Sequence, residues 1–166
     1  MKLTEQQLKI EYSSPSKRAC VFTGHRELDD PKLKVRIEKA VRVQIKKGVY
    51  TFYNGVAKGF DLLSAECILS LKKEYPFLKL IVCVPYYGQE KGYSKTDQER
   101  YRKILKEADE TLLLSDKYYK GCLLSRNRFM VEHCEEMIAY LKEPTGGTAY
   151  TVRYFQKLYD TEIYFL

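Results

Sequence analysis

Short apolar runs that end in glycine or small polar residues, each followed by a helical pattern, constrain the fold of this chain more than any other feature. Three of these runs cover residues 20–22, 50–53 and 137–141, and the turns after them read Thr23-Gly24-His25-Arg26, Asn54-Gly55 and Gly146-Gly147-Thr148. Strands that alternate with helices of this length form a parallel sheet with right-handed crossovers. The sequence therefore predicts an α/β fold, with an open, mostly parallel sheet of six strands and helices on both faces.

The same pattern predicts where each element lies. The predicted strands cover residues 18–22, 49–53, 78–84, 110–114, 136–141 and 162–166. The predicted helices cover residues 31–47, 61–74, 95–107, 122–133 and 148–158. Residues 1–17 are polar and contain Ser13-Ser14-Pro15-Ser16, so we expect a loosely attached extension followed by a single domain at 18–166.

Composition and cysteine usage indicate a globular protein of the cytoplasm. Hydrophobic residues make up 45% and charged residues 31% of the chain, which is ordinary for a globular domain. No apolar run approaches the roughly 20 residues that span a bilayer, and the amino terminus lacks the apolar core of a secretory signal. The five cysteines form no C-x-x-C pair and lie mostly in apolar runs, so we expect reduced, buried thiols and no metal site.

The carboxyl edge of the predicted sheet is suited to an anionic small molecule, for which a nucleotide is the leading prediction. The strand-to-helix turns of a parallel sheet collect at that edge, where open α/β folds bind ligands. Helix amino termini there provide free N–H groups and the positive ends of helix dipoles, which favour phosphate. The sequence lacks G-x-G-x-x-G, G-x-x-x-x-G-K-[ST] and G-x-S-x-G motifs, so it does not predict a conventional dehydrogenase, kinase or hydrolase.

The turn after the first strand supplies the first candidate ligand residues, Thr23-Gly24-His25-Arg26. A glycine directly after a buried strand lets a ligand approach the backbone closely, and Arg26 can pair with phosphate through two hydrogen bonds. For His25 two readings stay open: an acid–base group, or a cap on neighbouring backbone.

The second strand-to-helix turn adds two acidic candidates. Gly55 and Gly59 permit tight backbone geometry, and Asp61 either caps the next helix or binds a ribose hydroxyl. Glu66 shares a helical face with apolar residues, where an unpaired carboxylate is unfavourable. Glu66 therefore either pairs with an arginine such as Arg26 or faces a polar pocket. Asp61 and Glu66 are also the two candidate catalytic acids.

Three later segments complete the candidate ligand site. Arg126, Asn127 and Met130 lie on neighbouring faces of the fourth predicted helix. Gly146-Gly147-Thr148 opens the last helix and is either an anion nest or a capped glycine turn. Tyr86 follows the third strand at the same edge, where its ring is placed to stack on a base.

The net charge of +7 leaves a nucleic-acid partner open. Seven basic residues and a single acid occupy the first predicted helix: Lys32, Lys34, Arg36, Lys39, Arg42, Lys46 and Lys47, with Glu38. Such a face is either a solvated outer surface or a contact for nucleic acid, and the solvated surface is the favoured reading.

The motifs at these positions, taken in order, resemble the YpsA-like branch of the SLOG superfamily, which groups the DNA-processing protein DprA with the LOG phosphoribohydrolases. The resemblance covers residues 18–166, and its motifs are Thr23-Gly24-His25-Arg26, Gly55…Gly59-x-Asp61, Arg126-Asn127-x-x-Met130-Val131 and Gly146-Gly147-Thr148. It implies a Rossmann-like fold and a nucleotide or nucleotide-derived ligand. NAD and ADP-ribose are examples of such a ligand. It also implies that Gly59 and Asp61, which match a G-x-[DE] motif, belong to the ligand site.

The LOG catalytic motif is only partly present. LOG hydrolases carry P-G-G-x-G-T-x-x-E with a catalytic glutamate, and Thr151 stands where that glutamate would fall. Asn127 stands where LOG proteins have a lysine after the arginine. The leading hypothesis is therefore a nucleotide-binding sensor or effector module that acts through a protein partner or a homo-oligomer.

Two other hypotheses stay open. The first is an enzyme that cleaves an N-glycosidic or phosphate bond of a nucleotide with Asp61 or Glu66 as the acid. The second, less favoured, is a DprA-like protein that binds single-stranded DNA through the basic helix at 31–47. No membrane partner is predicted.

Overall fold

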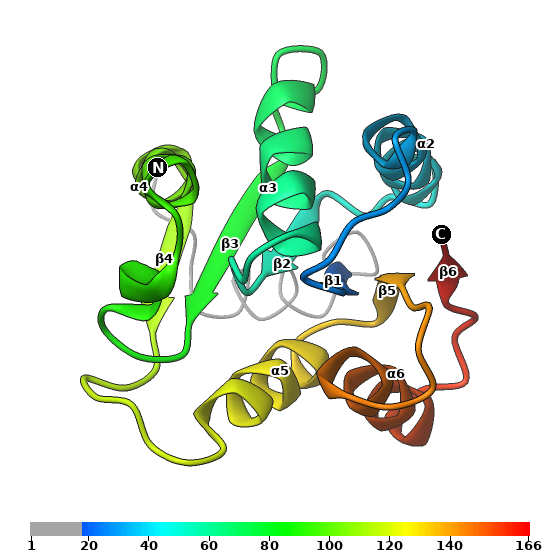
Figure 1. Cartoon of the computed structure of the whole chain (residues 1–166). Coiled ribbons are helices and arrows are strands. Elements are labelled where there is room, and N and C mark those ends of the chain that lie inside the picture. Colours follow the sequence, from blue (N-terminus) through cyan, green and yellow to red (C-terminus); the bar gives the residue numbers. More distant parts are fainter. Residues whose placement is uncertain (1–17) are drawn as a thin grey trace, which may run out of the picture.

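Six parallel strands form one sheet in the computed structural model, which describes residues 18–166 (Figure 1). The strand order is β4-β3-β2-β1-β5-β6, and every neighbouring pair is parallel. The strands are β1 (Ala19–Gly24), β2 (Thr51–Asn54), β3 (Lys79–Val84), β4 (Glu110–Leu113), β5 (Glu136–Tyr140) and β6 (Tyr164–Phe165). The predicted fold class is confirmed, whereas the predicted extension at residues 1–17 lies outside the described residues.

Helices cover both faces of the sheet. From β1 the chain steps outward through β2 and β3 to β4, and then returns to β5 beside β1. Because right-handed crossovers in opposite directions place their helices on opposite faces, α2, α3 and α4 lie on one side and α5 and α6 on the other (Figure 1). The helices are α2 (Leu33–Lys46), α3 (Phe60–Leu71), α4 (Lys95–Glu107), α5 (Cys122–Glu132) and α6 (Gly147–Leu158), with a short 3-10 helix, η2 (Gln89–Gly92), before α4.

Apolar side chains pack in two clusters, one on each face of the sheet. On the side of α2, α3 and α4, Phe22 stacks on Phe52 with ring centroids 5.6 Å apart, and Phe60 packs edge-on against Phe22. On the opposite side, Val21 packs in a cluster with Phe155. Consecutive residues of β1 join different clusters because successive side chains of a strand point to opposite faces. This two-sided burial explains the continuous apolar run in the sequence.

The boundaries of the elements agree closely with the sequence pattern. α4 begins and ends at the predicted residues, and the Ser94 hydroxyl oxygen accepts a hydrogen bond from the backbone N–H of Asp97 (3.2 Å) at its amino terminus. The last strand is shorter than the predicted 162–166, because only Tyr164 and Phe165 pair with β5.

Removing the Phe52 ring tests the packing between the sheet and α2–α4. We expect Phe52→Ala to lower the free energy of unfolding by about 3–5 kcal/mol, because the buried ring leaves a cavity. Phe77→Ala is the matched control, since this ring is 50% exposed and its loss should destabilise the fold far less. Urea denaturation of both variants measures the difference, and equal losses would contradict the assigned core.

Candidate ligand site

A cavity of about 470 Å³ opens at the carboxyl edge of the sheet, between β1 and β5. The strand order changes direction at this point, and such switch points are where open α/β sheets bind ligands. The volume lies within the range of roughly 300–1,000 Å³ that is usual for small-molecule sites. The lining residues are Phe22, Thr23, Gly24, His25, Arg26, Ala57, Asp61, Leu123, Leu124, Arg126, Asn127, Gly147 and Thr148.

Two other hollows lie away from this edge. One of about 390 Å³ lies between α3 and α4, and one of about 700 Å³ lies under the starts of β1, β2 and β3. Their charged lining residues are all partly or fully exposed. The switch-point cavity differs because two buried side chains of opposite charge, Asp61 and Arg126, line it.

Arg126 reaches from α5 to the ends of β2 and β3. Its side chain is buried, with the residue only 3% exposed, and Nη1 donates hydrogen bonds to the carbonyl oxygens of Gly55 (2.5 Å) and Cys83 (3.2 Å). Nε donates to the side-chain oxygen of Asn127 (2.9 Å). Burial lowers the pKa of Arg126, and the negative charge of Asp61 opposes this shift.

The Arg126 charge has no ion-pair partner within residues 18–166. None of the ion pairs formed there within 4.0 Å includes its guanidinium group. In the same part of the chain, Nη2 makes no hydrogen bond, although Nη1 and Nε are both engaged. A buried cation without an ion-pair partner is unfavourable, and an anion that enters the cavity would reduce this penalty.

Gly55 is required by this arrangement. A Cβ atom at this position would lie 2.6 Å from the central carbon of the Arg126 guanidinium group, closer than two carbon atoms can approach. The Gly55 carbonyl oxygen also accepts a hydrogen bond from Nε2 of Gln89 (3.1 Å), which fixes its direction. The glycine therefore gives room to the buried arginine.

Asp61 lies in the first turn of α3 and is 7% exposed. Its Oδ2 accepts a hydrogen bond from the backbone N–H of Ala57 (3.2 Å). Burial raises the pKa of Asp61 to about 6, because a low-dielectric environment disfavours the carboxylate, while Arg126 acts in the opposite direction. The predicted role as helix N-cap is wrong, because Gly59 is the N-cap and α3 begins at Phe60.

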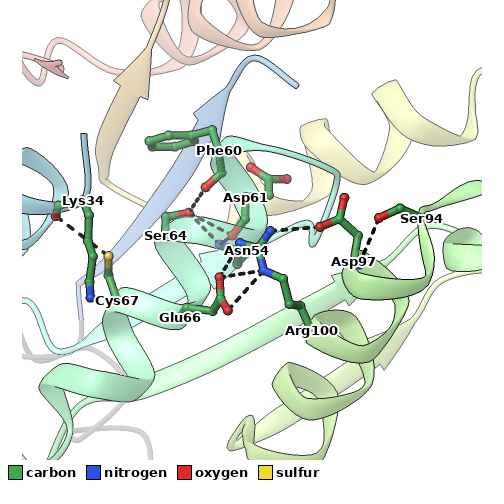
Figure 2. Close-up of polar contacts among 10 residues, drawn as sticks. All are labelled: Lys34, Asn54, Phe60, Asp61, Ser64, Glu66, Cys67, Ser94, Asp97 and Arg100. Carbon is green, nitrogen blue, oxygen red and sulfur yellow. Dashed lines mark hydrogen bonds and ion pairs between the residues drawn. The ribbon is translucent and has the colours of Figure 1, made fainter. Parts of the chain in front are cut away.

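A buried polar network holds the start of α3 (Figure 2). The side-chain nitrogen of Asn54 donates to the Asp61 carbonyl oxygen and to the Ser64 hydroxyl oxygen, both at 3.0 Å. The Asn54 side-chain oxygen accepts from the N–H of Val56 (2.8 Å), whose φ of 46° is unusual for a β-branched residue. Asn54 thus orients the turn that carries Asp61, a role that the sequence pattern, which marked Asn54 only as a turn residue, did not reveal.

Gly59 lets the turn after β2 pack closely against the turn after β1. Its φ is 75°, and a Cβ atom there would lie 2.2 Å from the carbonyl oxygen of Arg26. The next N–H, of Phe60, donates to the carbonyl oxygen of His25 (3.1 Å). Gly59 does not line the cavity, so its contribution to the site is the close packing of these two loops.

The amino terminus of α6 forms the other wall of the cavity. Gly146 is its N-cap, no side chain caps it, and its first turn contains no acidic residue. The side-chain nitrogen of Asn127 donates to the hydroxyl oxygen of Thr151 (3.1 Å), which in turn donates to the carbonyl oxygen of Gly147 (2.8 Å). Thr151 therefore ties α5 to α6 from a buried position.

Six predicted site residues do not line the cavity: Gly55, Gly59, Glu66, Tyr86, Met130 and Gly146. Glu66 pairs with Arg100 of α4, whose Nε lies 3.1 and 3.2 Å from its two carboxylate oxygens (Figure 2). The predicted pairing with an arginine is confirmed, but the partner is Arg100 and not the suggested Arg26. Five residues along a helix turn a side chain by about 140°, which is why Glu66 points away from the direction of Asp61. We therefore withdraw Glu66 as a ligand residue and as a catalytic acid.

Met130 and Tyr86 also lie outside the cavity and pack against other parts of the fold. Met130 is buried in the apolar cluster of α5 and α6, about 6 Å further along the helix than Arg126. The Tyr86 ring packs edge-on against Tyr118, with centroids 5.3 Å apart, and does not line the cavity. These two corrections, together with that of Glu66, restrict the site to the turns after β1, β2 and β5 and to the first half of α5.

The burial of the cysteines agrees with the sequence pattern. All five cysteines are buried and carry free thiols. Within residues 18–166, no cluster of three or more His, Cys, Asp or Glu side chains is arranged to hold a metal ion. None of the helices in this range is long and apolar enough to cross a membrane.

The fold and the motifs have a match among protein families. The model of the family YpsA, which is described as the YspA SLOG family, matches residues 18–166. This chain belongs to the YpsA family of the SLOG superfamily. A UPF0398 protein of Bacillus velezensis is 30% identical to this YpsA-family chain over 135 residues, which are 80% of the chain and 74% of the relative. The SPbeta prophage-derived protein YoqJ of Bacillus subtilis is 29% identical over 126 residues, covering 69% of the chain and 74% of YoqJ.

Solved structures of DNA processing protein A (DprA) share the fold. The Helicobacter pylori protein, described by its single-stranded DNA binding mode, gives a TM-score of 0.62 at 22% identity over 84% of this chain and 61% of its own. The Streptococcus pneumoniae protein gives 0.64 at 18% identity over 89% of this chain and 49% of its own. The YpsA-family chain thus spans about half to three fifths of these proteins, and the likeness confirms a Rossmann-like fold alone.

The raised pKa of the buried Asp61 carboxyl group can be tested without a ligand. Its pKa in the folded state, about 6, lies above its ordinary value of 3.8, so the folded state holds the proton more tightly than the unfolded state. Ionised Asp61 therefore lowers stability above about pH 6, and this penalty disappears as the pH falls toward 4. We expect Asp61→Asn to raise the free energy of unfolding at about pH 7.5 by on the order of 2–3 kcal/mol.

Urea denaturation at about pH 7.5 and pH 4 measures this effect. Asp97→Asn is the control. Asp97 is a partly exposed acid in the first turn of α4 that pairs with Arg100, so its ionised carboxylate should not destabilise the fold and its replacement should not raise stability. An Asp61→Asn variant that is less stable than the natural protein at pH 7.5 would contradict a buried, unpaired carboxylate.

Proposed function

We propose that this YpsA-family protein binds a nucleotide or nucleotide-derived molecule in the switch-point cavity and acts as a sensor or effector module. The observation that carries the proposal is the Arg126 guanidinium, which is buried, lines the cavity and has no carboxylate partner within residues 18–166. A phosphate group would supply the missing anion and accept hydrogen bonds from Nη2.

Other groups around the cavity support a phosphate at the same end. The uncapped amino terminus of α6 contributes N–H groups and the positive end of a helix dipole. Arg26 adds a second positive charge at the exposed rim. Arg126, the start of α6 and Arg26 come from three different parts of the chain, namely α5, α6 and the turn after β1, and such convergence is typical of a ligand site.

Asp61 supports a ligand that carries a hydroxyl group as well as a phosphate. A carboxylate accepts hydrogen bonds but repels phosphate, so Asp61 suits a neutral donor such as a ribose hydroxyl. A nucleotide carries both groups, and a cavity of about 470 Å³ is in the usual size range for small-molecule sites. Binding would change the charge and order of the turns at the rim, and a partner protein or a second copy of the chain would detect that change.

A nucleotide-processing enzyme is the second candidate function. The favouring observation is Asp61 itself, since a carboxyl group with a pKa of about 6 can act as a general acid near neutral pH. Thr151, at the position of the LOG catalytic glutamate, is not an acid, and its hydroxyl is engaged with Asn127 and Gly147. Because Glu66 lies elsewhere, Asp61 is the remaining candidate acid of the two that the sequence suggested.

A thermal-shift screen against mono-, di- and cyclic nucleotides, NAD and ADP-ribose tests the proposal. A ligand at 100 times its dissociation constant should stabilise the protein by about 2.7 kcal/mol. We expect Arg126→Met to abolish the shift, because it removes the buried charge, and Arg128→Met to keep it, because Arg128 lies outside the cavity and pairs with Tyr150.

Two further variants keep the result interpretable if Arg126→Met does not fold. Arg26→Ala removes the exposed rim charge and should weaken binding without loss of stability. Asp61→Asn should weaken the binding of nucleotides while it stabilises the fold, which separates the two effects. Turnover that disappears in Asp61→Asn would favour the enzyme. The absence of any shift across the panel would overturn the nucleotide proposal and favour single-stranded DNA, which the Helicobacter pylori DprA of the same fold binds.

A further inference from the structure

His25 joins three chain segments at the rim of the cavity. Its ring nitrogen Nε2 accepts hydrogen bonds from the backbone N–H groups of Lys142 (2.7 Å) and Glu143 (3.3 Å), in the loop between β5 and α6. Its carbonyl oxygen accepts from the N–H of Phe60 at the start of α3. Its ring packs edge-on against Tyr140, with centroids 5.9 Å apart. The β1 turn, the start of α3 and the β5–α6 loop thus meet at one residue.

These contacts determine the protonation state of the ring. A backbone N–H can only donate, so Nε2 must carry no proton. The imidazole is therefore neutral, with its proton on Nδ1. An imidazolium has a proton on both nitrogens and cannot accept either hydrogen bond.

The loop that His25 holds leads directly into the phosphate end of the proposed site. Residues 142–147 are all exposed, and they precede Thr148, which lines the cavity with Gly147. Within residues 18–166, the other side-chain hydrogen bonds to this segment come from α6: Nη1 of Arg153 donates to the carbonyl oxygen of Pro144 (3.2 Å), and the Thr151 hydroxyl donates to that of Gly147 (2.8 Å). Since few contacts hold the segment, the two hydrogen bonds to His25 account for much of what fixes its position.

We infer that His25 is a positioning residue: its neutral imidazole holds the β5–α6 loop in the ligand-binding geometry, and protonation releases the loop and weakens binding. The inference rests on the proposed function and adds to it a dependence on pH. His25 need not touch the ligand, because it acts through the backbone of Lys142 and Glu143 on the amino terminus of α6.

The charged and titratable groups around the His25 ring include both positive and negative side chains. The β5 side contributes Tyr140, whose hydroxyl donates to Asp29 (2.5 Å), and the loop contributes Lys142 and Glu143. The turn that carries His25 contributes Arg26, Asp29 and Asp30, and the α3 side contributes Asp61 at the cavity. Asp61 ionises in the same pH range as histidine, so a pH dependence alone would not identify His25.

Two substitutions separate the contributions. His25→Gln places an amide oxygen near the position of Nε2, so it keeps an acceptor that takes up no proton. His25→Phe keeps a ring against Tyr140 and removes the acceptor. Asp61 is unchanged in both variants, so a difference between them reports on the imidazole nitrogen.

Amide hydrogen exchange of the ligand-free protein tests the loop contact itself. In the natural protein, the protection factors of the Lys142 and Glu143 amides should fall between about pH 7.5 and pH 5. They should stay high at both pH values in His25→Gln and low at both in His25→Phe. The Phe60 amide is the internal control, because it bonds to the His25 backbone and should keep its protection. An acid loss that persists in His25→Gln would overturn the inference.

Binding of the nucleotide found in the screen tests the consequence for function. We expect affinity to fall by roughly tenfold between about pH 7.5 and pH 5 beyond any fall seen in His25→Gln, the size expected for the loss of one or two backbone hydrogen bonds. Equal pH profiles in the two proteins would overturn the role in binding. If no nucleotide binds at either pH, the proposed function fails, and the exchange measurement alone decides whether His25 holds the loop.

Discussion

The burial of one guanidinium group organises the functional edge of this protein. Arg126 extends from α5 on one face of the sheet to the carbonyl groups at the ends of β2 and β3. Gly55 provides the room for it, and Asn127 connects it to Thr151 on α6. The hydrogen bonds of this single buried cation therefore join α5 to the ends of β2 and β3, and Asn127 extends the connection to α6. A neutral side chain at position 126 could not make the same set of donor contacts.

The same arrangement carries a cost in stability. Arg126 and Asp61 are both buried, have opposite charges and line one cavity, yet they form no ion pair within 4.0 Å. Two charges that are close but not paired are less favourable than a salt bridge or an apolar pair. Buried ionisable groups with shifted pKa values cluster at functional sites, where function offsets the loss of stability. The polar network of Asn54 and Ser64 holds Asp61 in this position despite the penalty.

Membership of the YpsA family explains the architecture but not the chemistry. The DprA structures are 22% and 18% identical to this chain, and at such identities only the fold is comparable. The LOG glutamate position is occupied by Thr151, which has become part of the contact between α5 and α6. A fold of this kind supports many functions, and the residues in the cavity decide among them. In this chain they are suited to bind phosphate and a hydroxyl group.

Local patterns in the sequence determined the elements, their order and the edge at which the site lies. Helical periodicity placed α4 at Lys95–Glu107, and the glycine turns after β1, β2 and β5 marked the loops that surround the cavity. These features depend on residues close together in the chain, so the sequence alone carries them. Only the tertiary structure decided which side chains meet. Glu66 pairs with Arg100, 34 residues away, and Arg126 contacts Gly55, 71 residues away. Such pairings depend on the rotation of each helix about its axis and on how deeply it packs, which no local pattern specifies.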